Sequence, residues 1–529
     1  MRSIEIPPPS ERDWRYRAFE ILPGALTWIV LFLPAVLAII SPKLAAYFII
    51  AYLLMWFVRA VGLNVRSLQG WKILDQHRKI PWEKLNADLE VLQARTIDVP
   101  KWHAKNIERV SRYMGSERIK PSQVLHAVII AAYNESRDVL EPTVKAVMAS
   151  SYDLKKIILI IAYEERGGDG IAKTAQDLIA EFGGVFYHAE AVQHPKDIPG
   201  EVIGKGGNIT FAGRRLQKFL AGKNIDPLRV LVTTLDSDNR PDKQYLPALT
   251  YTYCSTEDPK HASYQPIPMF LNNIWDAPAP MRVVATGNSF WMVVQSLRPH
   301  MLRNFSAHAQ PMAALIDTDF WSVRTIVEDG HQFWRSYFRY DGRYEVFPIF
   351  VPIYQDAVLT DKYTRTLKAQ FIQVRRWAWG VSDIAYVAYM GFMRPNQIPR
   401  AKLIAKFARL LEGHVSWSTA PLILLLAALV PFFLNPQSYI ANQLPQVASR
   451  LQTVAMAGIL VTLFLSMRTL PPKPERYKRH RNVWMILQWV YLPLTTIVYS
   501  SFAAINSQTR LMFGWYLGKF DVTEKAVRK

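Results

Sequence analysis

Two apolar runs near the N-terminus are each long enough to cross a membrane. Residues 23–41 and 44–63 are almost free of charge, and about 20 apolar residues span a hydrocarbon core as a helix. Only Pro42 and Lys43 separate the runs, and no small-residue cleavage pattern lies between them, which favours a helical hairpin over a secretory signal. Basic residues flank both outer ends of the hairpin, so both ends are predicted to be cytoplasmic.

Three further apolar runs lie near the C-terminus, at residues 420–434, 451–467 and 483–505. The loop after the first run has no Lys or Arg and is predicted to be outside, whereas the loop after the second is strongly basic. A third full crossing would place the tail outside, although the tail is basic. We therefore expect the last run to bend at Pro493 and return, or otherwise not to span, with a simple crossing as the alternative.

The stretch between the two apolar regions contains no run long enough to cross a membrane. Strand-like apolar runs alternate there with amphipathic helical stretches, in the order 124–132, 139–148, 157–162, 171–182, 184–190, 208–220 and 229–238. This alternation predicts a mainly parallel sheet covered by helices on both faces. The expected fold class is an α/β cytoplasmic domain inserted between α-helical membrane segments.

Polar side chains gather where the predicted strands end. They are Tyr133, Asn134 and Glu135, then Glu164 and Glu165, then Asp236 and Asp238. Because ligands of parallel sheets bind at the carboxyl ends of the strands, this edge is the candidate active site.

Composition narrows the classes of function. The chain has 529 residues, a net charge of +20 and 50% hydrophobic residues. Its single cysteine, Cys254, excludes an internal disulfide, a cysteine metal cluster and a CxxC redox pair. Many cations flank apolar runs, so we expect the lipid bilayer and an anionic substrate as partners, and no nucleic acid.

The segment Asp236-Ser237-Asp238 closes an apolar strand. Two carboxylates at a strand end can bind a hard cation such as Mg²⁺ or Mn²⁺, which in turn binds a diphosphate. A solvated turn is the alternative, because the following residues also favour turns.

A second acidic pair, Glu328 and Asp329, follows an aromatic segment, and one of these carboxylates could accept a proton from a hydroxyl. A helix N-terminus or a salt bridge would also explain the pair. The segment 373–379, QVRRWAW, combines donors for phosphate oxygens with flat faces that suit a sugar ring. Its alternative is an interfacial amphipathic helix.

These motifs, in this order, resemble the membrane-embedded family 2 glycosyltransferases, the group of cellulose and hyaluronan synthases. The resemblance covers nearly the whole chain and implies a cytoplasmic GT-A (Rossmann-like) domain. It implies that the donor nucleotide is bound by Ala132, Tyr133, Asn134, Glu135, Glu165, Lys205 and Asp236, with Gly207 and Asn208 opening a helix after Lys205. It also implies that Asp236 and Asp238 hold the metal and that Asp329, next to Glu328, is the general base.

The same resemblance assigns the acceptor side and the tail. Thr286, Gly287, Gln373, Arg376 and Trp377 would face the acceptor and the diphosphate. The gating element of cellulose synthases matches Phe520, Val522, Thr523 and Lys525. The segment Ala162-Tyr163-Glu164-Glu165-Arg166 departs from the usual Asp-Asp or Asp-Gly, and the apolar segments are fewer than in cellulose synthase.

The implied activity is inverting transfer of a sugar from a nucleotide donor, expected to be a UDP-sugar, to a glycan acceptor. A processive polysaccharide synthase is expected, and single transfer to a lipid-linked acceptor is the alternative. The expected location is the plasma (inner) membrane, and protein partners cannot be read from the residues. The expected organisation is a cytoplasmic N-terminus (1–22), a hairpin (23–64), a GT-A domain (65–365), interfacial helices (366–415), membrane helices (416–505) and a cytoplasmic gating-like tail (506–529).

Overall fold

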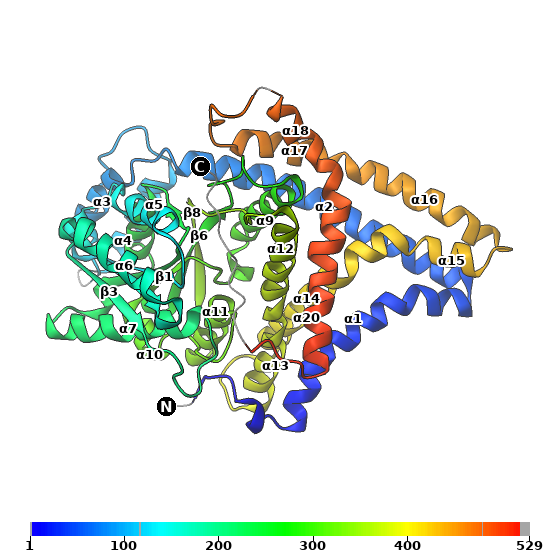
Figure 1. Cartoon of the computed structure of the whole chain (residues 1–529), viewed down its shortest axis with the longest axis horizontal. Coiled ribbons are helices and arrows are strands. Elements are labelled where there is room, and N and C mark those ends of the chain that lie inside the picture. The colour runs from blue at the N-terminus through cyan, green and yellow to red at the C-terminus, as the bar shows by residue number, and fades with distance from the viewer. Residues whose placement is uncertain (1–2, 116–117, 479, 519–529) are drawn as a thin grey trace.

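The computed structural model describes residues 3–115, 118–478 and 480–518 (Figure 1). An eight-stranded mixed sheet forms the centre of the inserted domain, with strand order β3-β2-β1-β4-β7-β6-β8-β5. Its strands are β1 (Leu125–Ala132), β2 (Ile157–Glu164), β3 (His188–His194), β4 (Val230–Asp236), β5 (Arg240–Pro241), β6 (Ala262–Met269), β7 (His308–Pro311) and β8 (Glu345–Tyr354).

Four strands correspond to the strands predicted from the sequence: β3, β2, β1 and β4. They all run in one direction and form a parallel half of the sheet. The other half is mixed: β7 is antiparallel to β4 and β6, whereas β6 and β8 are parallel. One strand boundary differs from the prediction. Residues 183–185 form a 3-10 turn at a Gly-Gly pair, so β3 begins at His188 and ends at His194.

Helices cover both faces of the parallel half. Val128 and Ile130 of β1 face one layer, which contains α3 (Trp82–Val91), α4 (Trp102–Tyr113), α5 (Arg137–Met148), α6 (Asp169–Phe182) and α8 (Tyr245–Cys254). Ala127 and Ile129 face the other, which contains α7 (Lys205–Gly222) and α10 (Met312–Asp317). Alternate residues of one strand enter different cores because successive side chains point to opposite faces. This is why β1 and β2 are almost entirely apolar.

Long apolar helices extend away from the sheet (Figure 1). They are α1 (Trp14–Ile40), α2 (Pro42–His77), α14 (Arg400–Leu426), α15 (Leu429–Leu434), α16 (Tyr439–Met456) and α17 (Gly458–Thr469). Within the described residues, four helical segments are long and apolar enough to cross a membrane: Trp14–Ile40, Pro42–His77, Tyr439–Thr469 and Arg481–Met512. The turn between α1 and α2 and the end of α15 meet at the tip farthest from the sheet, where Asn435 Nδ2 donates to Ala38 O at 3.0 Å.

The last apolar run forms a continuous helical segment, with α18 (Arg481–Leu487), α19 (Leu492–Thr495) and α20 (Ala503–Met512) joined by 3-10 and π-helical stretches. The segment does not turn back at Pro493, so the expected bend is wrong. Pro493 lies in the first turn of α19, where its missing N–H breaks no helical hydrogen bond. The segment runs beside α12 (Tyr363–Ala378) and crosses α1 and α14 (Figure 1).

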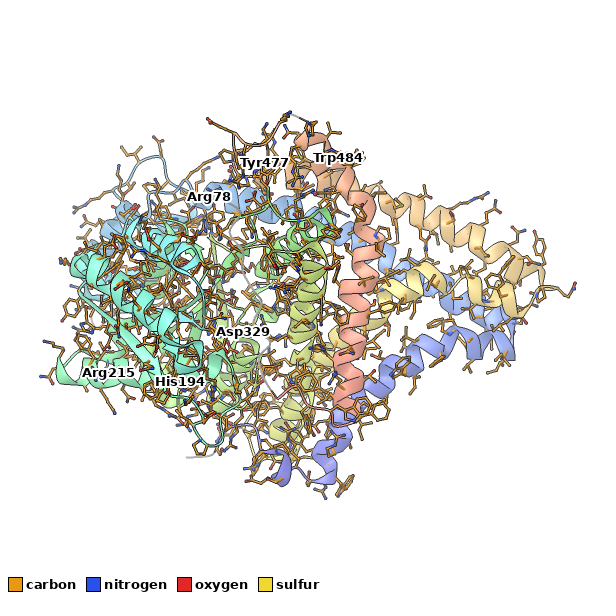
Figure 2. The ribbon with its side chains drawn as sticks, in the orientation of Figure 1. Arg78, His194, Arg215, Asp329, Tyr477 and Trp484 are labelled. Carbon is orange, nitrogen blue, oxygen red and sulfur yellow. The ribbon has the colours of Figure 1, made fainter. Side chains whose placement is uncertain are left out.

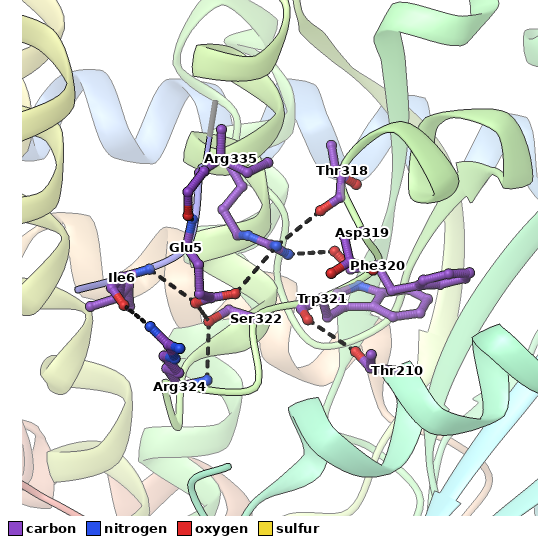
Figure 3. Close-up of polar contacts among 12 residues, drawn as sticks. Glu5, Ile6, Thr210, Thr318, Asp319, Phe320, Trp321, Ser322, Arg324 and Arg335 are labelled. Carbon is purple, nitrogen blue, oxygen red and sulfur yellow. Dashed lines mark hydrogen bonds and ion pairs between the residues drawn. The ribbon is translucent and has the colours of Figure 1, made fainter. Parts of the chain in front are cut away.

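The chain ahead of α1 is bound to the inserted domain (Figure 3). Glu5 accepts a hydrogen bond from the Ser322 hydroxyl and forms an ion pair with Arg335, at 3.3 Å between Oε2 and Nη2. Arg335 is only 2% exposed and also donates to the carbonyls of Thr318 and Phe320. The N-terminal segment therefore supplies the counter-charge for a buried guanidinium of the inserted domain.

Candidate active site

The carboxyl ends of β1, β2 and β4 meet at one edge, as the sequence predicts. Asn208, in the first turn of α7, donates through Nδ2 to the carbonyls of Ala132 (3.3 Å) and Ala162 (2.9 Å). It thereby ties the start of α7 to β1 and β2. Beyond β1, the backbone N–H of Tyr133 donates to Glu135 Oε2 at 2.7 Å, while Asn134 is exposed.

A chain of polar contacts joins four residues at this edge. Lys205 Nζ lies 2.7 Å from Asp236 Oδ1, and the Ser306 hydroxyl donates to Asp236 Oδ2 at 3.0 Å. The backbone N–H of Ser306 donates to Asp329 Oδ2 at 2.6 Å. Lys205 is nearly buried, at 9% exposed, whereas the Asp236 side chain is 37% exposed. The partly exposed carboxylate of Asp236, the ammonium group of Lys205 and the carboxylate of Asp329 are therefore held together.

The start of α7 is shaped by its glycines. A Cβ at Gly206 would lie 2.3 Å from the carbonyl oxygen of Ser322, so no other residue fits there without a shift. Ser322 is the residue that Glu5 contacts (Figure 3). The N-terminal segment therefore braces the loop that packs beside Lys205.

Asp238 is buried and its carboxylate is held by its neighbours. Oδ2 accepts from the backbone N–H of Asp356 at 3.1 Å, and the Asn239 amide, oriented with Nδ2 toward it, donates to Oδ1 at 3.2 Å. Asn272 Nδ2 donates to the Asp238 carbonyl at 2.8 Å. Because β8 ends beside β6, this part of the site depends on the mixed half of the sheet. Residues 237–238 form a turn in which the Asn239 N–H donates to Asp236 O at 3.0 Å, and these contacts hold the buried Asp238 within that turn.

The acidic pair opens α11 (Glu328–Arg339). Burial, and then the charge of Asp329, raises the pKa of Glu328 to about 8. Burial also raises the pKa of Asp329, although Lys205 and the N–H groups of Gly330 and Ser306 oppose the shift. Asp329 lies near the centre of the molecule (Figure 2) and is partly accessible, whereas Glu328 is only 4% exposed. Of the two carboxyl groups, Asp329 is the one a substrate can reach.

A histidine at the end of β3 completes the rim. His194 Nε2 lies 3.0 Å from Glu201, and Nδ1 lies 3.2 Å from Glu164. Burial opposes the charged ring, but the two carboxylates outweigh it and raise the pKa of His194 to about 9. Glu165 lies farther out and accepts from the backbone N–H of Lys196 at 2.9 Å. The departure from the usual acidic pair therefore places Glu164 in a buried ion pair with His194 and Glu165 at the rim.

The residues predicted for the acceptor lie on two helices. Thr286 and Gly287 are in the middle of α9 (Ala279–Ser296), where Thr286 is buried and a Cβ at Gly287 would face open space. Gln373, Arg376 and Trp377 are in the second half of α12.

Phe270, which follows β6, connects these two helices. Its N–H donates to Ser289 Oγ of α9, and its ring lies 6.0 Å from that of Trp377. The link from both helices to Asp238 therefore runs through residues 270–272. The gating residues Phe520, Val522, Thr523 and Lys525 lie outside the described residues.

Two polar residues of the site were not predicted. Ser306 joins Asp236 to Asp329, and Gln355 Nε2 donates to the Ser306 hydroxyl at 3.1 Å. Ser306 has a positive φ of 33°, a sparsely populated backbone conformation of the kind found at functional sites. Its sequence context, Asn-Phe-Ser-Ala-His, carries no pattern that would have indicated it.

No family model and no curated protein matches the chain. Among solved structures, a mannosyltransferase from Pyrobaculum calidifontis, in complex with GDP-Man and Mn²⁺, is 12% identical with a TM-score of 0.40 and covers 85% of this chain and 99% of its own. TarS 1-349 of S. aureus is 12% identical with a TM-score of 0.36, covering 74% and 93%. GalNAc-T7, with UDP, GalNAc and Mn²⁺, is 11% identical with a TM-score of 0.35, covering 55% and 58%. These similarities are too low to assign an activity.

Proposed function

We propose that this chain is a membrane-bound glycosyltransferase that transfers a sugar from a nucleotide-diphosphate donor to an acceptor hydroxyl with inversion. One observation carries the proposal: Ser306 holds Asp236 and Asp329 through two adjacent donor groups, with Lys205 on the other side of Asp236. A site for a leaving diphosphate and a site for a proton acceptor thus lie side by side. The resemblance to family 2 enzymes agrees with this arrangement.

In the proposed reaction, Asp329 takes the proton of the acceptor hydroxyl as that oxygen attacks the anomeric carbon. The bond from this carbon to the diphosphate breaks, and the diphosphate leaves with the electron pair. Lys205 offsets the charge that develops on the leaving group. Attack from the face opposite the leaving group inverts the anomeric carbon. Glu328, whose pKa is about 8, keeps a second negative charge away from Asp329 near neutral pH.

The residues fit a divalent cation that arrives together with the diphosphate. Among the described residues there is no group of three or more His, Cys, Asp or Glu side chains arranged for a metal, so the protein alone offers an incomplete site. The Asp236 side chain is 37% exposed, and the carboxylate oxygens of Asp236 and Asp238 are the kind of ligand that Mg²⁺ or Mn²⁺ prefers. When bound, the cation would neutralise the donor diphosphate.

The nucleotide is assigned to the β1 and β2 ends and the acceptor to the face between α9 and α12. Ala132, Tyr133, Asn134, Glu135 and Glu165 line the first region, and a UDP-sugar is the expected donor. Thr286, Gly287, Gln373, Arg376 and Trp377 belong to the second. The contact of Phe270 with α9 and α12 supports a shared acceptor surface.

The helices support a multi-pass topology with the catalytic domain in the cytoplasm. We assign crossings to α1, α2, and α16 with α17, which are long and apolar enough to span. We assign the fourth to α14 with α15, which ends at the same tip as α1, rather than to Arg481–Met512. This even number returns the chain to its starting side. The segment from α18 to α20 then lies along the cytoplasmic face. Its exposed apolar side chains, Val483, Leu487, Val490 and Leu494, recur at helical spacing and would face lipid. The basic tail stays inside, as the charge bias requires.

Within this organisation, the residue boundaries expected from the sequence are kept for the catalytic domain (65–365) and the interfacial helices (366–415). The plasma membrane is the proposed location. A processive polysaccharide synthase and a single-transfer enzyme acting on a lipid-linked acceptor share all the chemistry above, and product length separates them.

The experiment is incubation of the purified protein in lipid with radiolabelled UDP- and GDP-sugars, with Mn²⁺ or with EDTA. The proposal predicts label transfer from one donor, lost with EDTA, and a gel then gives the product size. Absence of transfer and of nucleotide release with every donor would contradict it.

A further inference from the structure

Six cations gather beside the candidate site, and we call them the basic cluster. They come from three separate parts of the chain: the cytoplasmic end of α2, the loop after α9 and the first half of α14. Its members are Arg66, Arg298, Arg303, Lys402, Lys406 and Arg409.

The charges of the cluster are close enough to act on one another. Burial, and then the charges of Lys402, Arg303 and Arg409, lowers the pKa of Lys406 to about 8, with Glu345 opposing. The pKa of Arg298 is lowered by burial and by Arg66 and Arg409. Across the part of the chain that the structure describes, none of the six forms an ion pair with an Asp or Glu, although the charge of Asp383 acts on Arg303 from a greater distance. Such a concentration of like charge is unfavourable unless an anion binds there.

The inner members of the cluster lie over aromatic rings of α11. Arg303 Cζ is 5.8 Å from the centre of the Trp334 ring, and Lys406 Nζ is 5.4 and 5.2 Å from those of Phe333 and Tyr337. Both cations are half-buried. Ring faces hold cations in place without neutralising them, which leaves the positive charge available to a ligand.

Two parts of the chain connect the cluster to the proposed base, Asp329: helix α11 and the loop from Arg303 to Ser306. Asp329 opens α11, and at about 1.5 Å per residue Phe333 and Tyr337 lie about 6 and 12 Å farther along the helix. Arg303 is three residues before Ser306, whose N–H donates to Asp329. An acceptor that offers its hydroxyl to Asp329 would therefore place its next group, one sugar unit away, at these cations.

The cluster also lies where two helices enter the proposed membrane. Arg66 follows the apolar run 44–63 of α2, and Arg409 precedes the apolar second half of α14. In the proposed topology these positions would be at headgroup depth rather than in the open cytoplasm.

We propose that the basic cluster binds the phosphoryl group of a membrane-held acceptor, a lipid that carries the accepting hydroxyl on a phosphate or diphosphate. This inference rests on the proposed glycosyltransferase activity and favours the lipid-linked form of it. Ordinary lipid headgroups would suffice to explain Arg66 and Arg409. They do not explain Arg303 and Lys406, which lie over aromatic rings of α11, the helix that Glu328 and Asp329 open.

The test measures binding of a polyprenyl phosphate and of the matching polyprenol to the full chain in neutral detergent micelles. Wild type should bind the phosphate roughly tenfold or more tightly than the alcohol, since charge-assisted hydrogen bonds of this kind are each equivalent to about a factor of ten. The double variant Arg303→Gln, Lys406→Met should lose this preference. Lys173→Met, an exposed cation on α6, is the matched control and should keep it.

Donor nucleotide binding, measured by calorimetry on the same samples, reports separately on folding and on the proposed activity. If the double variant does not bind nucleotide, Lys406→Gln alone replaces it. Equal affinity of wild type for phosphate and alcohol would overturn the inference. So would displacement of polyprenyl phosphate by phosphatidylglycerol at equal concentration, or transfer to a neutral oligosaccharide that is unaffected by the variants. Failure of wild type to bind any nucleotide sugar would instead contradict the proposed function.

Discussion

The ammonium group of Lys205 lies 2.7 Å from one carboxylate oxygen of Asp236, and the Ser306 hydroxyl binds the other. Burial alone would lower the pKa of Lys205, but the carboxylates around it outweigh burial and raise the pKa. The lysine is therefore held charged at the place where a leaving diphosphate would gain negative charge. Asp236 is at the same time held from both sides, with 37% of its side chain exposed.

The contact between Ser306 and Asp236 gives the first prediction. Ser306→Ala removes the hydroxyl but keeps the backbone N–H that holds Asp329, so the base stays in place while Asp236 loses one partner. Because Asp236 is partly exposed, we expect a modest loss in kcat, roughly 3- to 10-fold. Ser296→Ala, which removes a buried hydroxyl at the end of α9, serves as the control. Unchanged kcat in Ser306→Ala would show that the hydroxyl does not position Asp236.

Much of this site follows from the sequence. The apolar runs at β1, β2 and β4 predict a parallel sheet, and a parallel sheet brings Tyr133, Glu165 and Asp236 to one edge whatever the loops do. Ser306 could not be predicted, because its position depends on β7 pairing with β4 in the antiparallel half. The path of residues 481–512 could also not be predicted from the sequence, because a helix of that length and polarity fits either across a bilayer or along it.

The second prediction concerns the N-terminal segment. Glu5→Gln leaves the buried Arg335 without its counter-charge, and we expect a loss of about 1–3 kcal/mol in stability. The melting temperature in detergent should fall. Glu11→Gln, an exposed carboxylate six residues on, should leave it unchanged. Equal melting temperatures for the two variants would mean that the N-terminal segment does not stabilise the domain.

A pH dependence of stability follows from His194. Its pKa in the folded chain, about 9, is above the ordinary histidine value of 6.5, so folding favours the protonated ring. The contribution is complete below pH 6.5 and is lost as the pH rises through 9. Unfolding curves measured from pH 6 to 10 should therefore show a decline in this window that His194→Gln lacks. The half-buried His261→Gln should retain the wild-type decline.

Membrane topology can be tested by labelling with an impermeant maleimide in a Cys254→Ala background. A cysteine at Ser438 should react in intact cells, because the α15–α16 turn lies at the outer tip. Cysteines at Glu475 and Ala526 should react only after lysis if the last helical segment lies along the cytoplasmic face. Labelling of Ala526 in intact cells would mean that residues 481–512 cross the membrane.

The central claim is that Asp329 is the general base of a sugar transfer, and its replacement by Asn tests this most directly. Asn is nearly isosteric but cannot take a proton, so turnover with the active donor should fall by about 10² to 10⁴. Donor affinity measured by calorimetry should stay near that of wild type. Asp319→Asn, an exposed aspartate at a positive φ that Asn tolerates, is the control and should keep full turnover. Near-full turnover in Asp329→Asn would contradict the assignment.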